Sequence, residues 1–485
     1  MPDTDVTISL GALRSDGQPH EVAYTTADGA TETAQAIALD GHETRTSEYG
    51  TDNVDLAAGT YYVGTDINYT NVKMRPQGNI TLILADGCTM HLGTEDNPTN
   101  VTGIEKISDL TIYGQSLDAA TAGTISYVGT GGKGFYVGNY TQHSGNVSIS
   151  NSPYTGGGGI VANSVTLNGG KLSVATNSKK AIAIYTDGDG GITINGGQLD
   201  ATATGSDDLC GLYAYDGGTI TLGWTNPTDR ITASSYSSTV TVADGQALTD
   251  GSGHYYSGTL GSDEITAIGG QTLAPFTSLN LTANLAPDDN YWTTFYCGNV
   301  GFDIEGNACV YTATYASGQL TLHKLGTDGK TIPADCAVII VGESNEVNLS
   351  VNTSAPAYTN DPVNSLRGVD VDTSTSDIQS TLGSGTFYVL GMTTVNEEKH
   401  FGFHKYEGTT MAARKAFVLV GGSNAALARS LTMVFDDATG IKALYADSVD
   451  AKDGGAWYTL DGRRLQGKPA VSGMYINNGK KIIVK

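Results

Sequence analysis

The chain has 485 residues, enough for two to four domains of about 100 to 200 residues each. It carries 26 basic and 50 acidic side chains, and this net charge of −24 argues against nucleic acid and anionic membrane surfaces as partners. Charged residues make up 16% and hydrophobic residues 39% of the chain, which excludes a disordered acidic tail. No apolar run approaches the roughly 18 residues of a membrane span, so we expect no direct membrane insertion.

Strand patterns dominate the chain. Thr, Val, Ile and Tyr alternate with polar residues, and Gly, Asn and Asp interrupt them at intervals of roughly 8 to 12 residues. Runs with a helical apolar period are too short to build a helical layer. We therefore predict an all-β protein, in which residues 1–45 form an N-terminal β cap over the open end of the next domain.

Two short phrases recur in the following region. The first is LTIYGQ at position 110, VSISNS at 147, VTLNGG at 165, ITINGG at 192 and ITLGW at 220, and the last three begin 27 and 28 residues apart. The second phrase alternates with the first, as GFYVG at 134, GIVAN at 159, AIAIY at 181 and GLYAY at 211. Two strand phrases within a period of roughly 20 to 30 residues predict stacked coils of a β-solenoid over residues 46–273.

The VTLNGG phrase also predicts a corner between strands. Val165 and Leu167 are expected to point inward, and Asn168 with Gly169 to supply the left-handed backbone that a sharp corner requires. Coils in register would then bring Asn195 of the next phrase beside Asn168, where the two amides can form a hydrogen-bonded ladder. We assign these asparagines a structural role.

The phrases VTLNGG and ITINGG, followed by ATATGSDDLCGLYAYDGG, resemble the parallel β-helix family of bacterial surface carbohydrate-binding proteins. Members of that family bind cellulose and pectic polysaccharide and carry calcium on their coils. The resemblance covers residues 52–258. It implies a right-handed parallel β-helix, a polysaccharide partner and a calcium cofactor.

An outward column of tyrosines is the candidate carbohydrate-binding surface. Alternation along the strands turns Tyr185 outward in AIAIY, and both Tyr213 and Tyr215 outward in GLYAY. We expect Tyr185 to lie about 4.8 Å from Tyr215 on the next coil, with Tyr136 on the same face on an earlier coil. Exposed rings can stack on sugar faces while their hydroxyls form hydrogen bonds. The alternative is that these tyrosines only pair across strands or lie under a loop.

Acidic residues in the turns are candidate calcium ligands, because calcium prefers carboxylate and carbonyl oxygens that converge from neighbouring loops. The candidates are Asp187, Asp189, Asp207, Asp208 and Asp216. The same Asp- and Gly-rich sequence is typical of ordinary turns, since Asp tolerates left-handed backbone.

Catalysis is the third possibility, because Asp207 and Asp208 resemble the paired acids of polygalacturonases. The Gly-His-Gly and Arg-x-Lys phrases of that enzyme family do not occur in the predicted solenoid. The commonest pectate lyases use an arginine base, and no arginine occurs between Pro76 and Asp229. We therefore predict that the protein is not an enzyme and has no catalytic residue.

Residues 274–440 contain the strand runs DCAVIIVG, GTFYVLG and KAFVLVG. Short strands separated by turns predict a β-sandwich, with a small barrel as the alternative. In the same region Cys297 and Cys309 could form a disulfide, or they could remain two separate buried thiols.

The end of the chain, residues 441–485, contains WYTLDGRRL and GMYINNGKKIIVK. It resembles the C-terminal sorting module of Bacteroidetes proteins exported by the type IX secretion system. We expect Asp461 and Gly462 to form a turn and Gly473 to open the next strand of a small β module. The resemblance implies that secretion machinery is a partner and that the protein is secreted or lies on the outer cell surface.

These expectations together predict a secreted or cell-surface, non-catalytic carbohydrate-binding protein. The alternative from another class is a structural adhesin or spacer, and a polysaccharide lyase or glycoside hydrolase comes third.

Overall fold

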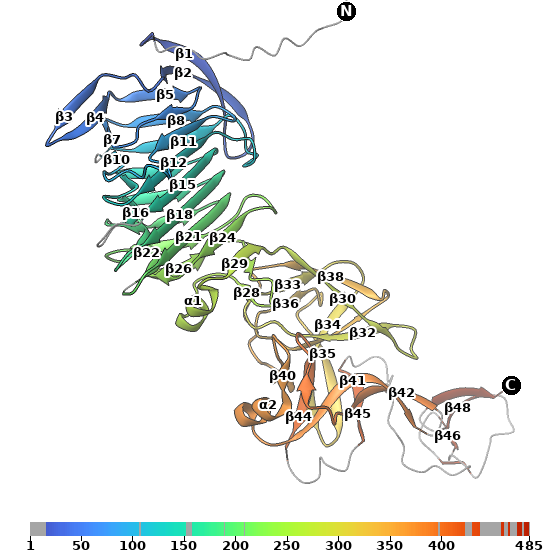
Figure 1. Ribbon diagram of the computed structural model, residues 1–485. Helices are drawn as coiled ribbons and strands as arrows, with labels where there is room; N and C mark the ends of the chain where they lie inside the picture. The colour runs from blue at the N-terminus through green and yellow to red at the C-terminus, as the bar shows by residue number, and fades with distance from the viewer. Residues whose placement is uncertain are drawn as a thin grey trace, which may run out of the picture.

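The computed structural model describes residues 16–105, 108–151, 158–188, 190–207, 209–395, 398–421, 429–436, 457–459, 464–465, 473–477 and 480–484. This part of the chain is nearly all β, as predicted, with two short helices, α1 (Ser262–Ile268) and α2 (Thr375–Leu382). Figure 1 shows a tall stack of strands at the N-terminal side, followed by further sheets toward the C-terminus. Neither described helix has the length and hydropathy needed to cross a membrane.

Three sheets form the stack. The first contains, in spatial order, β1 (Pro19–Thr25), β2 (Thr31–Leu39), β5 (Gly59–Val63), β8 (Ile80–Leu84), β11 (Leu110–Gly114), β14 (Asn139–Gln142), β17 (Ser164–Leu167), β20 (Ile192–Ile194), β23 (Thr219–Leu222) and β26 (Thr239–Val242). The second contains β25 (Tyr236–Ser237), β22 (Cys210–Ala214), β19 (Ile182–Thr186), β16 (Gly158–Ala162), β13 (Phe135–Tyr136), β10 (Ile104–Glu105), β7 (Val72–Pro76), β4 (Thr51–Leu56) and β3 (Arg45–Glu48). The third contains β28 (Tyr255–Tyr256), β27 (Leu248–Thr249), β29 (Thr272–Pro275), β24 (Arg230–Ala233), β21 (Gln198–Thr204), β18 (Lys171–Asn177), β15 (Asn146–Asn151), β12 (Thr124–Gly129), β9 (Thr89–Leu92) and β6 (Ile67–Asn68).

The chain visits these three sheets in turn. After β17 in the first sheet it forms β18 in the third and β19 in the second, and β20 then returns to the first. Successive visits pair in parallel, with Val165 opposite Ile192 and Leu172 opposite Leu199. The result is a solenoid-like stack, in which each coil pairs with the coils before and after it.

Alternating side chains build one apolar core inside the stack. In β18, Leu172 and Val174 are buried, whereas Lys171 and Ala175 are exposed. Inward residues of all three sheets belong to a single buried cluster. Each coil therefore buries its apolar side chains mainly against its neighbours, as the repeat predicts.

The N-terminal strands both extend and cover the stack. β1 and β2 pair in an antiparallel manner, and β2 pairs in parallel with β5. Val22 and Ala36 of this pair are buried against Tyr62 and Ile83 on the outer face of the first sheet. At the other end, α1 buries Ile268 against the core of the stack.

The predicted asparagine ladder is confirmed. The Asn195 amide donates a hydrogen bond of 2.8 Å to the side-chain oxygen of Asn168. The left-handed residues at these corners are Gly170, with φ of 75°, and Gly197, with φ of 86°, rather than Asn168 and Gly169 as we predicted. A Cβ on Gly197 would lie 2.6 Å from the Gly170 carbonyl oxygen, so glycine also permits the close approach of two coils.

Two further sheets follow the stack. The smaller contains β30 (Ser278–Thr282), β38 (Glu346–Val351), β33 (Phe302–Ile304) and β36 (Thr331–Ile332). The larger contains β31 (Asn284–Leu285), β32 (Tyr291–Phe295), β37 (Val338–Gly342), β34 (Cys309–Ala316), β35 (Gln319–Lys324), β45 (Ser430–Phe435), β42 (Glu398–Lys405), β41 (Thr386–Val395), β44 (Ala416–Val420) and β39 (Leu366–Gly368). β40 (Thr373–Ser374) pairs with β43 (Thr410–Met411) beside them.

The larger of these two sheets has a buried apolar core of its own. Trp292 of β32 and Phe401 of β42 lie in one buried cluster, with ring centroids 5.6 Å apart. The Ser365 amide donates a hydrogen bond of 2.7 Å to the Ala313 carbonyl oxygen, which links the residue before β39 to β34. On the opposite face of β32, Phe295 packs against Phe302 of the four-stranded sheet at 5.3 Å.

All five cysteines are free thiols. Cys297 follows β32 and Cys309 begins β34, and β37 lies between these two strands in the sheet. Two strand spacings, roughly 10 Å, exceed the reach of a disulfide. The separate-thiol interpretation therefore holds, although Cys309 is only partly buried. Burial raises the pKa of the Cys297 thiol.

Arg414 links the stack to the two sheets that follow it. Its guanidinium carbon lies 3.8 Å from the centroid of the Tyr255 ring, and it donates a hydrogen bond to the Gly253 carbonyl. It also lies 3.6 Å from a carboxylate oxygen of Asp370. Tyr255 in turn stacks on Phe276, with ring centroids 3.7 Å apart.

The described part of residues 441–485 is a four-stranded antiparallel sheet. Its strands, in spatial order, are β47 (Arg464–Leu465), β46 (Trp457–Thr459), β48 (Gly473–Asn477) and β49 (Lys480–Val484). Gly473 opens a strand as predicted. The predicted turn at Asp461 and Gly462 lies outside the described residues.

Candidate functional site

A single row of outward positions runs along the second sheet, and we call it the outer row. Strand register places its members one above the other, about 4.8 Å apart. They are Asp55, Arg75, Glu105, Tyr136, Val161, Tyr185, Tyr213 and Ser237. The members that come first in the chain are charged, and we call this part the charged end of the row. The later members are largely aromatic.

Three tyrosines form the aromatic end, and we call Tyr185, Tyr213 and Tyr215 the tyrosine cluster. The ring centroids of Tyr185 and Tyr213 lie 5.5 Å apart with an interplanar angle of 59°. Tyr215 lies 6.2 Å from Tyr185 and 6.1 Å from Tyr213, and its ring meets the Tyr213 ring edge-on at 83°. The rings therefore support one another at angles and do not form one flat platform.

The register of the tyrosine cluster corrects our prediction. Tyr185 lies opposite Tyr213, and not opposite Tyr215 as expected. The structure pairs Ile184 with Leu212, which is a shift of two residues from the pairing that the aligned phrases predict. A shift of two keeps every side chain on its own face of the sheet, so alternation cannot distinguish the two registers.

The tyrosine cluster is open to solvent on one side. Tyr215 is 48% exposed, and Tyr185 and Tyr213 are partly buried. Among the residues that the structure describes, none accepts or donates a hydrogen bond to the three hydroxyl groups. Partial burial, and next the negative charge of Asp187, raise the pKa of Tyr185. The three hydroxyls are thus available to a ligand.

Tyr136 lies in the same outer row but apart from the cluster. The Lys133 ammonium lies 3.8 Å from the centroid of the Tyr136 ring. Val161 separates Tyr136 from Tyr185 in the row and is 4% exposed. Burial lowers the pKa of Lys133, while the charges of Asp187 and Glu105 oppose that change. The structure therefore brings three of the four predicted tyrosines into contact and places the fourth two strands away.

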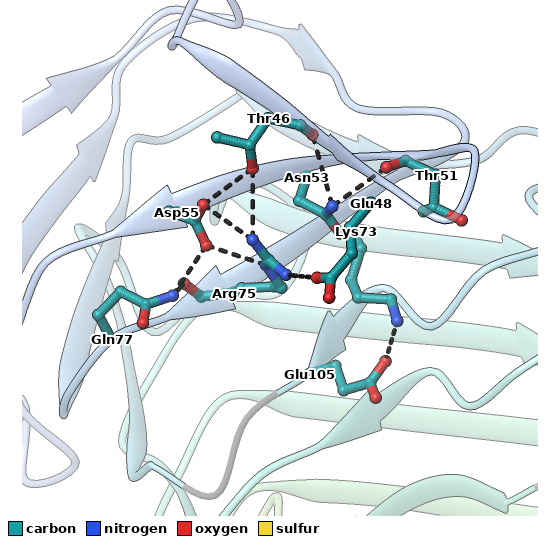
Figure 2. Close-up of polar contacts among 9 residues, drawn as sticks. All are labelled: Thr46, Glu48, Thr51, Asn53, Asp55, Lys73, Arg75, Gln77 and Glu105. Carbon is teal, nitrogen blue, oxygen red and sulfur yellow. Dashed lines mark hydrogen bonds and ion pairs between the residues drawn. The ribbon is translucent and has the colours of Figure 1, made fainter.

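Arg75 organises the charged end of the outer row (Figure 2). Its guanidinium donates two hydrogen bonds of 2.9 Å to the carboxylate of Asp55 and a third to Glu48. Thr46 and Gln77 complete this arginine cluster, with Gln77 donating to Asp55 at 2.8 Å. The hydrogen bonds from Arg75 hold the pKa of Asp55 below its usual value.

A second ion pair lies beside the arginine cluster. The Lys73 ammonium lies 2.5 Å from a Glu105 carboxylate oxygen, as Figure 2 shows. Our sequence analysis did not identify these residues. The sequence VKMRP contained a signal for them, because Lys73 and Arg75 alternate with the buried Val72 and Met74 and so point outward on one strand. These charged groups satisfy one another, which is the pattern of a structural cluster.

The predicted calcium ligands that the structure describes do not form one set. Asp187 follows β19 and Asp216 follows β22, but Asp207 precedes β22 at the opposite end of that strand. Five residues of strand separate those ends by roughly 16 Å. Asp207 lies 3.5 Å from the Lys179 ammonium instead.

The remaining predicted ligands, Asp189 and Asp208, lie outside the described residues. Within the described ranges, no three His, Cys, Asp or Glu side chains gather in a way that could hold a metal ion. Asp216 has φ of 54°, which fits the turn interpretation of these acidic residues. Calcium binding by these residues stays a prediction, since two of the five predicted ligands lie outside the described residues.

No family model, no curated protein and no solved structure matches this chain.

Proposed function

We propose that this protein is a secreted or cell-surface, non-catalytic carbohydrate-binding protein that binds polysaccharide at the tyrosine cluster. The observation that carries the proposal is a group of three mutually supported tyrosine rings, open to solvent, whose hydroxyls have no partner among the described residues. A sugar ring can place its apolar face against such an aromatic ring and exchange hydrogen bonds with the hydroxyl.

The net charge narrows the class of polysaccharide. With a net charge of −24, the molecule repels polyanions such as polygalacturonate, unless a cation bridges the two. We therefore propose a neutral glycan as the ligand. Calcium stays a prediction from the family resemblance, and glycan binding at the tyrosine cluster does not depend on it.

The scaffold that we propose is a right-handed parallel β-helix followed by a β-sandwich. The order in which the chain visits three parallel sheets supports the β-helix, and the shared buried cluster between the four-stranded sheet and β32 supports the sandwich. Residues 441–485 complete the proposal as an address for type IX export. The small antiparallel sheet of this segment supports the assignment, because the resemblance predicts a small β module there.

A glycan array of the full chain tests the binding proposal. We expect wild-type protein to bind neutral plant or host glycans, and the Tyr215→Ala variant to lose most of the signal. Tyr49→Ala is the matched control, because Tyr49 is 99% exposed and belongs to the hairpin that joins β3 and β4. Equal signals from Tyr215→Ala and Tyr49→Ala would reject the tyrosine cluster as the site. An added chelator should leave the signal unchanged.

The structural adhesin remains the second candidate, because the three rings also make the cross-strand contacts that a purely structural cluster would make. A blank array for wild-type protein, with and without chelator, would favour this candidate.

Export is tested separately in a host that has type IX secretion. Deletion of residues 441–485 should keep the protein inside the outer membrane without changing glycan binding by the purified protein. Surface display of the truncated protein would contradict the assignment of the terminal sheet.

A further inference from the structure

A cavity of about 210 Å³ lies in the larger of the two sheets that follow the stack, where strands from its two ends come together. β32 forms one wall, and β41, β42 and β44 form the other. Two contacts hold the walls together: the Ala416 amide donates to the Thr294 hydroxyl at 3.1 Å, and the Lys415 ammonium donates to the Thr293 hydroxyl at 3.1 Å. We call this space the seam cavity.

A glycine in the lining helps to keep the seam cavity open. Gly391 of β41 lies directly opposite Gly402 of β42, so neither strand supplies a side chain at that position. A Cβ added to Gly391, which lines the cavity, would meet no atom within 4 Å. The hollow is therefore built into the strand pairing.

Most of the cavity lining is apolar. Trp292 and Phe401 are almost fully buried and meet edge-on, with ring centroids 5.6 Å apart. Met411, Val389 and Leu390 extend this lining. Such walls favour the hydrocarbon part of a ligand over water.

Lys415 is the one charged side chain among the lining residues. An ammonium group has three donors, and Thr293 accepts from one of them. No carboxylate of the described residues lies within ion-pair distance of Lys415, and no acidic side chain lines the cavity. Burial lowers the pKa of Lys415, which is the response of a cation that lacks a counter-charge.

We propose that the seam cavity binds a compact organic acid, whose carboxylate accepts hydrogen bonds from Lys415 and whose hydrocarbon body lies against Trp292 and Phe401. The site is separate from the tyrosine cluster, and the proposal does not depend on glycan binding. An apolar cavity of about 150 Å³ can hold benzene. The seam cavity is large enough for a ring of that size with a carboxylate attached.

Isothermal titration calorimetry of the full chain tests the proposal, with sodium benzoate as the probe and benzamide as its neutral analogue. We expect benzoate to bind at least tenfold more tightly than benzamide. Lys415→Met should lower the affinity for benzoate at least tenfold and leave that for benzamide unchanged. Lys415→Arg should retain most of the benzoate affinity, because it keeps the charge.

Gly391→Leu is the independent variant, since it fills the cavity and leaves Lys415 in place. It should abolish binding of both probes, and an unchanged unfolding temperature shows that the variant is folded. Quenching of Trp292 fluorescence by benzoate, lost in Trp292→Phe, locates the probe. Failure of benzoate to bind at millimolar concentration, or equal benzoate affinities of wild type, Lys415→Met and Gly391→Leu, would overturn the proposal.

Discussion

The two ends of the outer row share one sheet and one register, but they differ in how their polar groups are satisfied. At the charged end, Arg75 and Lys73 both have carboxylate partners within the same sheet. At the aromatic end, the hydroxyls of the tyrosine cluster have no partner among the described residues. The strand register therefore aligns the side chains of the outer row, but it does not decide their role. Whether an aligned group is structural or available to a ligand depends on whether its neighbours satisfy it.

The largest expected effect comes from the aromatic end. Tyr213→Ala should weaken glycan affinity about thirtyfold, since loss of an aromatic anchor costs about 2 kcal/mol. Tyr213→Phe keeps the ring and should cost only about fivefold, the value of one hydrogen bond. Titration of one array-selected glycan measures both. Equal losses for the two variants would assign binding to the hydroxyl rather than the ring.

The charged end should respond in stability and not in binding. Arg75→Met leaves Asp55 and Glu48 facing each other without a cation, and we expect it to lower the free energy of unfolding by about 1 kcal/mol. Urea unfolding measures the change. Lys405→Met is the matched control, because its ion pair with Glu407 is isolated and more exposed. A loss of glycan affinity in Arg75→Met would contradict the assignment of a purely structural role to the charged end.

The asparagine ladder provides a smaller structural test on another sheet. Asn195→Ala removes the hydrogen bond to Asn168, and because this pair is exposed we expect a loss of about 0.5 kcal/mol. The urea midpoint should fall slightly while glycan affinity stays the same. A loss as large as that of Arg75→Met would mean that the ladder, and not the ion pairs, holds the coils in register.

The smallest effect concerns pH. Arg75 lowers the pKa of Asp55 in the folded protein, so this interaction stabilises the fold at pH values above the unfolded pKa of about 3.9. The stabilisation is lost as the pH falls through the lower folded value. The difference in unfolding temperature between wild type and Arg75→Met should therefore be constant near neutral pH and shrink below about pH 4. A difference that grows on acidification would contradict this assignment.

Local sequence patterns were sufficient to predict part of this structure. Alternation and the 27-residue spacing identified the buried Val165 and Leu167 and the neighbouring Asn168 and Asn195, because those contacts repeat from coil to coil. The pairing of Tyr185 was wrong because a shift of two residues preserves alternation.

Features that depend on distant segments were missed. The partners of Arg75 lie 20 and 27 residues away, and Glu48 reaches it only because β3 folds back on β4. The seam cavity requires β32 to meet β44 after more than a hundred residues of chain, as in the contact of Lys415 with Thr293, 122 residues apart. No short window of sequence contains either arrangement.

The outer row can lengthen only in whole coils. Duplication of one 27-residue repeat, the spacing of Asn168 and Asn195, would add one strand to each sheet and extend the row by about 4.8 Å, with each new strand pairing as the old ones do. A shorter insertion would instead have to loop out at a corner or break the alignment of every later coil. In evolutionary terms, a surface of this kind changes its length by gene duplication in fixed steps, while point mutations change only its chemistry at a given step.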